Sequence, residues 1–217
     1  VDTGLVTEFK YPPVIVEAFE NGNLQALTDF WTQPGWLPAN KAIVFVDNHD
    51  IQRGHAASGD IVNYKDGAAY DLAVAFMLAH PYGYPMVMSS YAFEDDQQGP
   101  PQSSPLDESA GCGSEWICEH RRNTIANMIT FRGAVQGTEL VDWQIIDDAV
   151  VSFGRGNKGH IVINTGGTAA NLNLPTSLPA GNYTDLISGV SAATVSDVGV
   201  LRMNVDARTA FAILSDQ

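Results

Sequence analysis

The stretch Ala-Ile-Val-Phe-Val-Asp-Asn-His-Asp, residues 42–50, joins five apolar residues directly to four polar ones. A continuous apolar run of this length predicts a strand that is buried on both faces, as in a parallel sheet covered by helices. In a parallel α/β barrel, the loops that follow the strands converge on the mouth, where active sites lie. The polar group at this point therefore favours a site that handles sugar or metal. A polar strand end that caps the next helix is the alternative that the residues leave open.

Strand and helix patterns alternate on both sides of this stretch. The predicted strands are residues 6–11, 42–46 and 85–91. The predicted helical segments are residues 13–30, interrupted around Gly22, and residues 67–80 and 115–135. This alternation implies parallel strands joined by crossover helices. Three strands of that kind need neighbours on both edges, so we expect further strands upstream of this chain.

The pattern changes after Gly137, where short apolar runs alternate with Gly, Pro, Asn and Asp. The runs predict an antiparallel β-sandwich with strands at residues 150–153, 160–164, 169–174, 183–185, 193–195, 198–205 and 209–214. We therefore divide the chain into an α/β domain, residues 1–136, and an all-β domain, residues 137–217. Residues 154–159 have the G-x-G-x-x-G spacing of a dinucleotide-binding loop. They lie between two predicted strands without a helix, so they predict a hairpin turn.

Composition excludes several classes of partner. The chain has a net charge of −14 and only 11 Lys and Arg residues, which argues against binding to nucleic acid. It has no apolar stretch of about 18 residues, so a membrane span is not expected. Neutral substrates agree better with this charge.

The two cysteines, Cys112 and Cys118, have five residues between them. That spacing is too long for a redox Cys-x-x-Cys pair, and no second pair or histidine cluster nearby indicates zinc. A local disulfide is the favoured interpretation, with two free thiols as the alternative. A disulfide indicates an oxidising compartment. The chain starts at Val1 without an initiator methionine, as a fragment or a processed product would.

Residues 45–50, Phe-Val-Asp-Asn-His-Asp, resemble the fourth signature region of the α-amylase family, and Gln-Arg-Gly-His at residues 52–55 resembles its animal-type extension. Further matches follow in the family's order at residues 7–11, 77–83, 87–91, 118–121 and 153–157. The resemblance covers most of the first 165 residues. It implies an α/β fold: strands 6–8 of a (β/α)8 TIM barrel, followed by an all-β antiparallel sandwich domain.

The resemblance also implies residue roles. Asp50 would stabilise the transition state, and His49 would hydrogen-bond the same sugar. His55 would contact substrate beside the cleavage point, although an exposed loop histidine is an equal alternative. The family's nucleophile and general acid belong to strands 4 and 5, whose motifs are absent from this chain. We therefore expect a C-terminal fragment, inactive alone, of a secreted, extracellular α-amylase that hydrolyses internal α-1,4 bonds of starch and glycogen with retention.

Two buried or helix-capping residues are expected to be structural. Asp47 would orient the strand end, and His80 would pack against apolar residues or cap its helix. A metal site built from His49, Asp50 and His55 is an alternative that we do not adopt, so no metal ligand is assigned in this chain.

Cofactors follow from the same resemblance. Animal-type members that bind chloride use an Asn at the position of Asn48 and an Arg or Lys at the position of Met86. A thioether supplies no positive charge, so we expect no chloride requirement. The family's calcium takes its usual ligands upstream of this chain, so calcium is expected only in the intact enzyme.

Two other functions remain open. The chain, or its all-β domain alone, could be a non-catalytic α-glucan-binding module; the aromatic residues available there are Trp143, Phe153, Tyr183 and Phe211. Two of these, Phe153 and Phe211, lie in strand patterns and are expected in the core. The other possibility is a transglycosylase with the same barrel.

Overall fold

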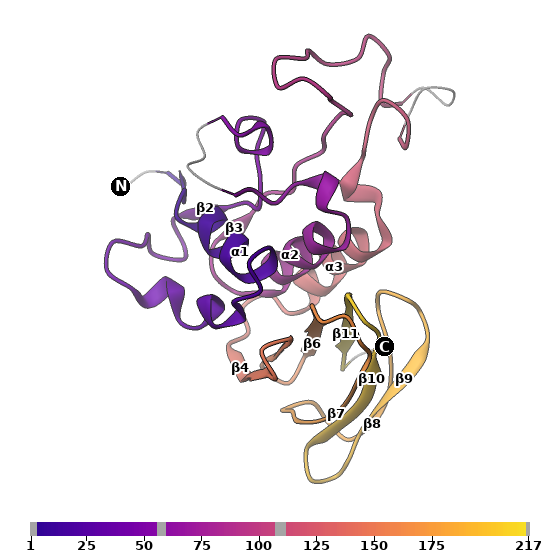
Figure 1. The fold of residues 1–217 in the computed structure, drawn as a ribbon. Coiled ribbons are helices and arrows are strands. Elements are labelled where there is room, and N and C mark those ends of the chain that lie inside the picture. Colours follow the sequence, from indigo (N-terminus) through magenta and orange to yellow (C-terminus); the bar gives the residue numbers. More distant parts are fainter. Residues whose placement is uncertain (1–3, 56–59, 107–111, 216–217) are drawn as a thin grey trace.

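The computed structural model describes residues 4–55, 60–106 and 112–215. Three parallel strands and three helices form one part, and two antiparallel sheets form the other (Figure 1). The parallel sheet has the order β1 (Val6–Thr7), β2 (Ala42–Val44), β3 (Tyr84–Pro85). The helices are α1 (Tyr11–Phe19), α2 (Ala68–Ala79) and α3 (Asn123–Ala134), one after each strand. This arrangement confirms the predicted parallel α/β unit.

The parallel strands are shorter than predicted. In place of a strand over residues 6–11, the chain turns after Thr7 and α1 begins at Tyr11. Two prolines, Pro12 and Pro13, favour this early start because proline suits the first turn of a helix. The buried Glu8 carboxylate fixes the turn by accepting the Lys10 and Leu37 amides. In place of a strand over residues 85–91, β3 ends at Pro85 and the following residues run beside the site.

The first helical segment is interrupted around Gly22, as predicted, and the third helix is shorter than predicted. Helix α1 ends at Phe19, and Gly22 adopts a φ of 75° before the 3-10 turns η1 (Leu24–Leu27) and η2 (Phe30–Thr32). Helix α3 begins eight residues later than predicted, at Asn123. Cys118 has a φ of 56° and redirects the chain into the 3-10 turn η5 (Glu119–Arg121). Turns of this kind leave little trace in hydrophobic periodicity.

The two antiparallel sheets confirm the predicted all-β unit. One has the order β11 (Thr209–Leu214), β6 (Gly159–Asn164), β5 (Val150–Arg155), β4 (Leu140–Ile146). The other has the order β7 (Ala170–Pro175), β10 (Val200–Val205), β9 (Ser191–Val195), β8 (Gly181–Thr184). Strand β5 leads directly into β6, so residues 154–159 form the predicted hairpin rather than a nucleotide loop.

Strand β4 was not predicted. Its register against β5 shifts between Val141 and Gln144, and Asp142 between them has a φ of 55°. Such a bulge interrupts the alternation of side chains that identifies a strand in a sequence. All seven residues of β4 are half-buried, so burial gives no alternation either.

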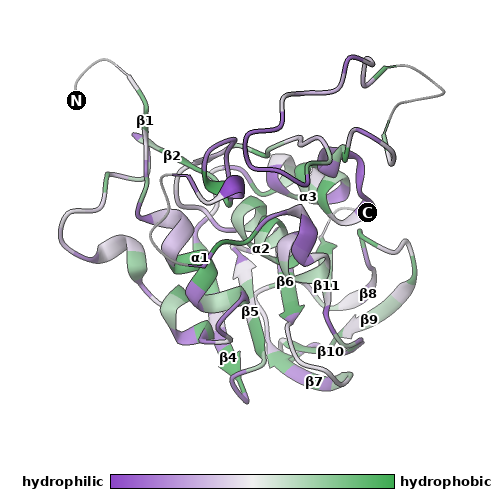
Figure 2. Ribbon diagram, turned by 45° about the horizontal axis from the view of Figure 1, so that its top comes forward, coloured by the Kyte–Doolittle hydropathy of each residue, from purple (hydrophilic) through white to green (hydrophobic). Residues whose placement is uncertain are grey.

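The sheet β11-β6-β5-β4 is buried on both faces. One face packs on the second sheet through Val162, Phe211 and Ile213. The opposite face packs on the helices, where the Phe76 ring of α2 lies 5.8 Å from the Phe153 ring of β5. Figure 2 shows the hydrophobic residues gathered on α2 and on these inner strands. The molecule is therefore layered as helices, inner sheet and outer sheet.

One hydrophobic core thus continues from the helices into the inner sheet. Arg155 of β5 strengthens this junction by donating hydrogen bonds to the carbonyl groups of Ala79 and Thr138. Helix α3 ends at Ala134 and β4 begins at Leu140, on either side of the boundary predicted at residues 136–137. That boundary stays a prediction, since nothing tests it independently. No helix in the described ranges is long and apolar enough to cross a bilayer.

Candidate functional site

Residues 47–50 follow the central strand β2 at its carboxyl end. Strands β1 and β3 flank β2 in parallel, so the segments after all three strands meet at this edge. Asn48 fixes the local backbone, because its Oδ1 accepts hydrogen bonds from the Asp50 amide at 3.0 Å and the Ile51 amide at 2.8 Å. This turn leads into the 3-10 turn η3 (Ile51–Arg53) and sets the direction of Asp50.

The structure brings His49, Asp50 and His55 into one short loop. The Asp50 carbonyl accepts from the amides of Arg53 at 3.1 Å and His55 at 3.0 Å. The side chains of His49 and Asp50 are 80% and 49% exposed, and His49 Nε2 lies 3.6 Å from Asp50 Oδ2. The half-exposed Asp50 carboxylate and the exposed His49 imidazole beside it offer acceptors and a donor to the hydroxyl groups of a sugar.

Asp47 lies beneath this loop and is buried. Its Oδ1 accepts a hydrogen bond from the Tyr70 hydroxyl at 3.2 Å, while its Oδ2 has no partner among the described residues. Burial raises the pKa of the Asp47 carboxyl to about 7, and the nearby Glu119 carboxylate adds to the rise. Its position agrees with the expected role of orienting the strand end rather than contacting substrate.

A second buried contact ties the segment after β3 to η3. Glu119, which is fully buried, accepts the Ser90 amide at 2.7 Å through Oε2. The Ser90 hydroxyl in turn donates to Gln52 Oε1 at 2.7 Å. These bonds hold the rim around Asp50 together from the inside.

His55 has a partner that the sequence analysis missed. Its Nε2 lies 3.3 Å from Asp96 Oδ2, and neighbouring Arg53 donates to the Asp96 and Gln98 carbonyls at 2.8 Å each. The loop that carries Asp96 shows no periodicity, and 41 residues separate Asp96 from His55. The one signal in the sequence is the acidic run from Glu94 to Asp96, which could pair with the basic residues Arg53 and His55.

Cys112 and Cys118 form the predicted disulfide. It closes the end of the long loop that projects above the helices in Figure 1. Within that loop, Trp116 packs edge-on against Tyr91 with ring centroids 5.9 Å apart. The disulfide therefore stabilises the loop beside the rim and plays no part in the chemistry.

The residues at the expected chloride position do not fit an anion. Asn48 Oδ1 accepts two main-chain amides, and Met86 is 53% exposed and carries no charge. Within the described ranges, no three His, Cys, Asp or Glu residues are arranged to hold a metal ion. Nothing in the described residues bears on calcium.

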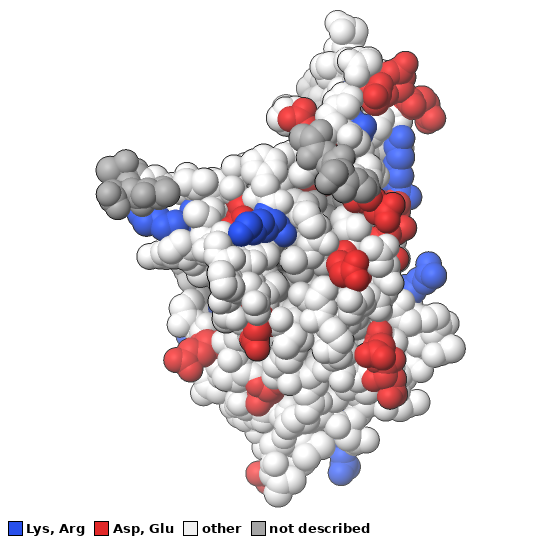
Figure 3. Space-filling model, turned by 60° about the vertical axis from the view of Figure 1, so that its left-hand side comes forward, with Lys and Arg blue, Asp and Glu red and all other residues white. Residues whose placement is uncertain are grey.

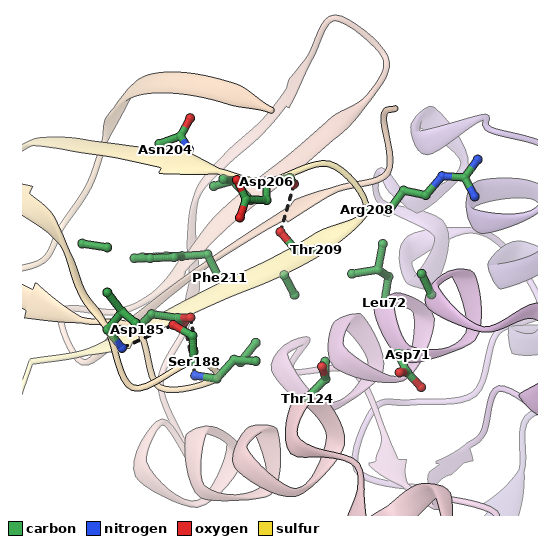
Figure 4. A pocket seen from close by; sticks show the side chains of 16 residues that line it. Asp71, Leu72, Thr124, Asp185, Ser188, Asn204, Asp206, Arg208, Thr209 and Phe211 are labelled. Carbon is green, nitrogen blue, oxygen red and sulfur yellow. Dashed lines mark hydrogen bonds between the residues drawn. The ribbon is translucent and has the colours of Figure 1, made fainter. Parts of the chain in front are cut away.

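A separate cavity lies away from this rim. It has a volume of about 460 Å³ and lies between α2, α3 and the strands β10 and β11 (Figure 4). Some of its polar side chains already form hydrogen bonds within the protein: Asp185 accepts from the Ser188 amide, and Thr209 donates to the Asp206 carbonyl. None of residues 47–55 lines it. The candidate site is instead the open rim at Asp50.

The surface charge agrees with a neutral ligand. Figure 3 shows Asp and Glu side chains distributed over one face with few Lys and Arg between them. That distribution reflects the net charge of −14. No broad basic surface is present on this face to attract a polyanion.

Comparisons with known proteins agree with this geometry. Residues 142–215 match the family described as alpha amylase, C-terminal all-beta domain. An alpha-amylase-related protein of Drosophila willistoni is 44% identical over 87% of this chain and 39% of its own length. Human pancreatic alpha-amylase is 40% identical over 86% of this chain and 40% of its own length. This chain thus spans about 40% of the length of the curated relatives it matches.

Solved structures give the same result. The crystal structure of alpha-amylase I from Eisenia fetida matches with a TM-score of 0.86 and 33% identity, over 97% of this chain and 49% of that one. A variant of the same enzyme, solved in complex with maltohexaose, matches with a TM-score of 0.84. The similarity covers both the parallel unit and the sandwich. The chain therefore belongs to the α-amylase family, and its β-sandwich is the C-terminal all-β domain expected from the sequence.

Proposed function

We propose that this chain is the C-terminal part of a secreted, endo-acting α-amylase that hydrolyses internal α-1,4-glucosidic bonds of starch and glycogen with retention. One observation carries the proposal: Asp50 and His49 stand exposed at the carboxyl end of β2, on a turn fixed by Asn48. Similarity to α-amylases supports it, as does the neighbour solved with maltohexaose.

The proposed mechanism gives this chain a binding role at the reacting sugar. The Asp50 carboxylate accepts hydrogen bonds from two ring hydroxyls and holds the sugar in the distorted form that resembles an oxocarbenium ion. His49 adds a further hydrogen bond to the same ring. Because these bonds strengthen as charge develops, they lower the barrier rather than only improving affinity.

Retaining hydrolysis also needs a nucleophile and a general acid about 5–5.5 Å apart. We assign both to the part of the protein that precedes Val1, together with the calcium ligands. The isolated chain is then inactive, and its partner is the remainder of the barrel. The disulfide supports the proposed secretion, because disulfides persist in oxidising compartments.

The experiment is a D50N substitution in the amylase that contains this chain, with maltoheptaose as substrate. D50N removes the carboxylate charge that stabilises the transition state, and we expect kcat to fall about 100- to 1,000-fold. The matched control is D60N, which removes an exposed carboxylate from the same loop and leaves activity unchanged. A D50N variant with more than about a tenth of wild-type kcat contradicts the proposal. Products longer than maltoheptaose identify a transglycosylase instead.

The glucan-binding alternative has no observation in its favour. Phe153, Tyr183 and Phe211 are all buried, the first and last as predicted. Trp143 stacks on Phe153 with ring centroids 5.4 Å apart, so it packs within the protein. These four aromatic residues therefore present no exposed pair for a starch surface.

A further inference from the structure

The loop after β3 approaches the rim at Asp50 through two groups of contacts. The first belongs to Arg53, whose guanidinium carbon lies 4.9 Å from the centre of the Tyr91 ring and 4.7 Å from that of Phe93. Its Nη1 donates to the Asp96 and Gln98 carbonyls. The guanidinium group of Arg53 is thus stacked on two aromatic rings and hydrogen-bonded to two carbonyl groups. These contacts hold residues 96–98 at a fixed position relative to η3.

The second group belongs to His55, two residues further on. Its ring nitrogen Nε2 lies 3.3 Å from Asp96 Oδ2 and 3.2 Å from Gln97 Nε2. A carboxylate can only accept, so the contact with Asp96 requires a hydrogen on His55 Nε2. The Gln97 side-chain amide also donates a hydrogen bond to the Asp96 carboxylate, so both residues lie on the Nε2 side of the His55 ring.

The protonation of Asp96 agrees with this assignment. The pKa of its carboxyl is lowered, chiefly by the hydrogen bond with His55. An ionised acceptor on Nε2 fixes one neutral tautomer of the imidazole and leaves Nδ1 with a lone pair. The His55 amide is bound to the Asp50 carbonyl, so the position of this ring is tied to the candidate catalytic residue.

We infer that Asp96 is a positioning residue for His55: it holds the Nε2–H tautomer so that Nδ1 accepts a hydroxyl of the glucan beside the cleavage point. The inference rests on the proposed function, because it needs a glucan at the rim. It assigns Asp96 no contact with the reacting sugar. Arg53 supports it by fixing the backbone from which Asp96 reaches the ring.

The first test is kinetic and uses the amylase that contains this chain, with maltoheptaose as substrate. D96A lowers kcat/KM about three- to tenfold, as expected for one hydrogen bond to a hydroxyl. In the H55A background the same substitution has no further effect, because Asp96 acts only through that ring. D96N keeps an acceptor oxygen and retains most of the activity. The matched control is E94A, which removes an exposed carboxylate from the same loop, two residues before Asp96.

The second test is independent of activity. Long-range 15N–1H spectra of the 217-residue chain, labelled in its histidines, report the tautomer of His55 directly. We expect the Nε2–H form in the wild type and in E94A, and a tautomer mixture in D96A. An unchanged His55 spectrum in D96A overturns the inference, as does an additive loss of activity in the double variant. If the spectra change as expected but the wild-type enzyme hydrolyses no glucan, the proposed function fails and the positioning contact stands.

Discussion

Asp47 and Asp50 are three residues apart on one strand end, yet their surroundings differ greatly. Asp50 is half-exposed on the rim, whereas Asp47 is buried against Tyr70. Burial raises the pKa of Asp47 to about 7, so its neutral form is the one that the folded chain prefers. A raised carboxyl pKa stabilises the fold below the unfolded value of about 4, and this stabilisation is lost as pH rises through about 7.

Two buried histidines act in the opposite direction. Burial, with the positive charges of Arg155 and Arg132, lowers the pKa of His80 to about 3. Burial lowers the pKa of His160 to about 4. Both take up a proton only on unfolding between these values and about 6.5, so their contribution to stability is present above pH 6.5 and is lost as pH falls.

A D47N substitution separates these effects. Between about pH 4.5 and 6, unfolding takes up two protons at the histidines and releases one from Asp47, so stability rises with pH by about 1.4 kcal/mol per unit. Without the Asp47 proton the slope is about 2.7 kcal/mol per unit. Urea unfolding at several pH values measures both slopes. D197N, at an exposed carboxylate, is the control; equal slopes in D47N and the wild type contradict the prediction.

Met86 gives a second prediction at this scale. A thioether, 53% exposed, stands where a chloride site would need a positive charge. We expect the activity of the intact enzyme to change less than about twofold when NaCl replaces a halide-free salt at equal ionic strength. A severalfold rise would show that another group supplies the charge.

At the scale of elements, Gly159 lets helix α3 lie directly on the inner sheet. A Cβ at this position would lie 2.7 Å from Val135 Cγ1 and 2.8 Å from Phe131 Cε2. G159A therefore forces α3 and β6 apart and lowers the free energy of unfolding by about 1–3 kcal/mol. G167A is a matched control, because a Cβ there meets nothing within 4 Å. Thermal unfolding distinguishes them, and equal midpoints for the two variants would show that the contact yields without cost.

Elements were predictable where side chains repeat regularly and unpredictable where backbone turns decide. The apolar run of β2 and the largely apolar α2 were recognisable from composition. Pro12 and Cys118 moved the starts of α1 and α3, and the bulge at Asp142 hid β4. The same limit applies to the site. Asp50 and His49 were found because they adjoin a strand, whereas Asp96 reaches His55 only through tertiary folding.

At the scale of the whole molecule, both edges of the parallel sheet are exposed. Exposed apolar side chains adjoin both edge strands: Leu5, Val6 and Phe9 at β1, and Tyr84 and Met86 at β3. In this chain the amides of Val6 and Met86 bond to carbonyl groups of the central strand segment, so only the alternate amides of each edge strand face outward. If further strands complete a barrel, as proposed, those outward amides are bonded there.

Hydrogen exchange tests this directly. We expect the amides of Thr7 and Val87, which alternate with the bonded amides of Val6 and Met86, to exchange quickly in the 217-residue chain and at least about 100-fold more slowly in the intact enzyme. Amides of β6, central in both proteins, serve as the internal reference. Equal rates at the edges in both proteins would mean that no strand pairs there.

The shared core has a practical consequence for protein engineering. Phe76 and His80, at the end of α2, lie against Phe153, and His80 also meets Trp143 edge-on. The β-sandwich therefore cannot be exchanged independently of α2. A chimera between two amylases must take both sides of this aromatic contact from one parent, or restore the packing by compensating substitutions.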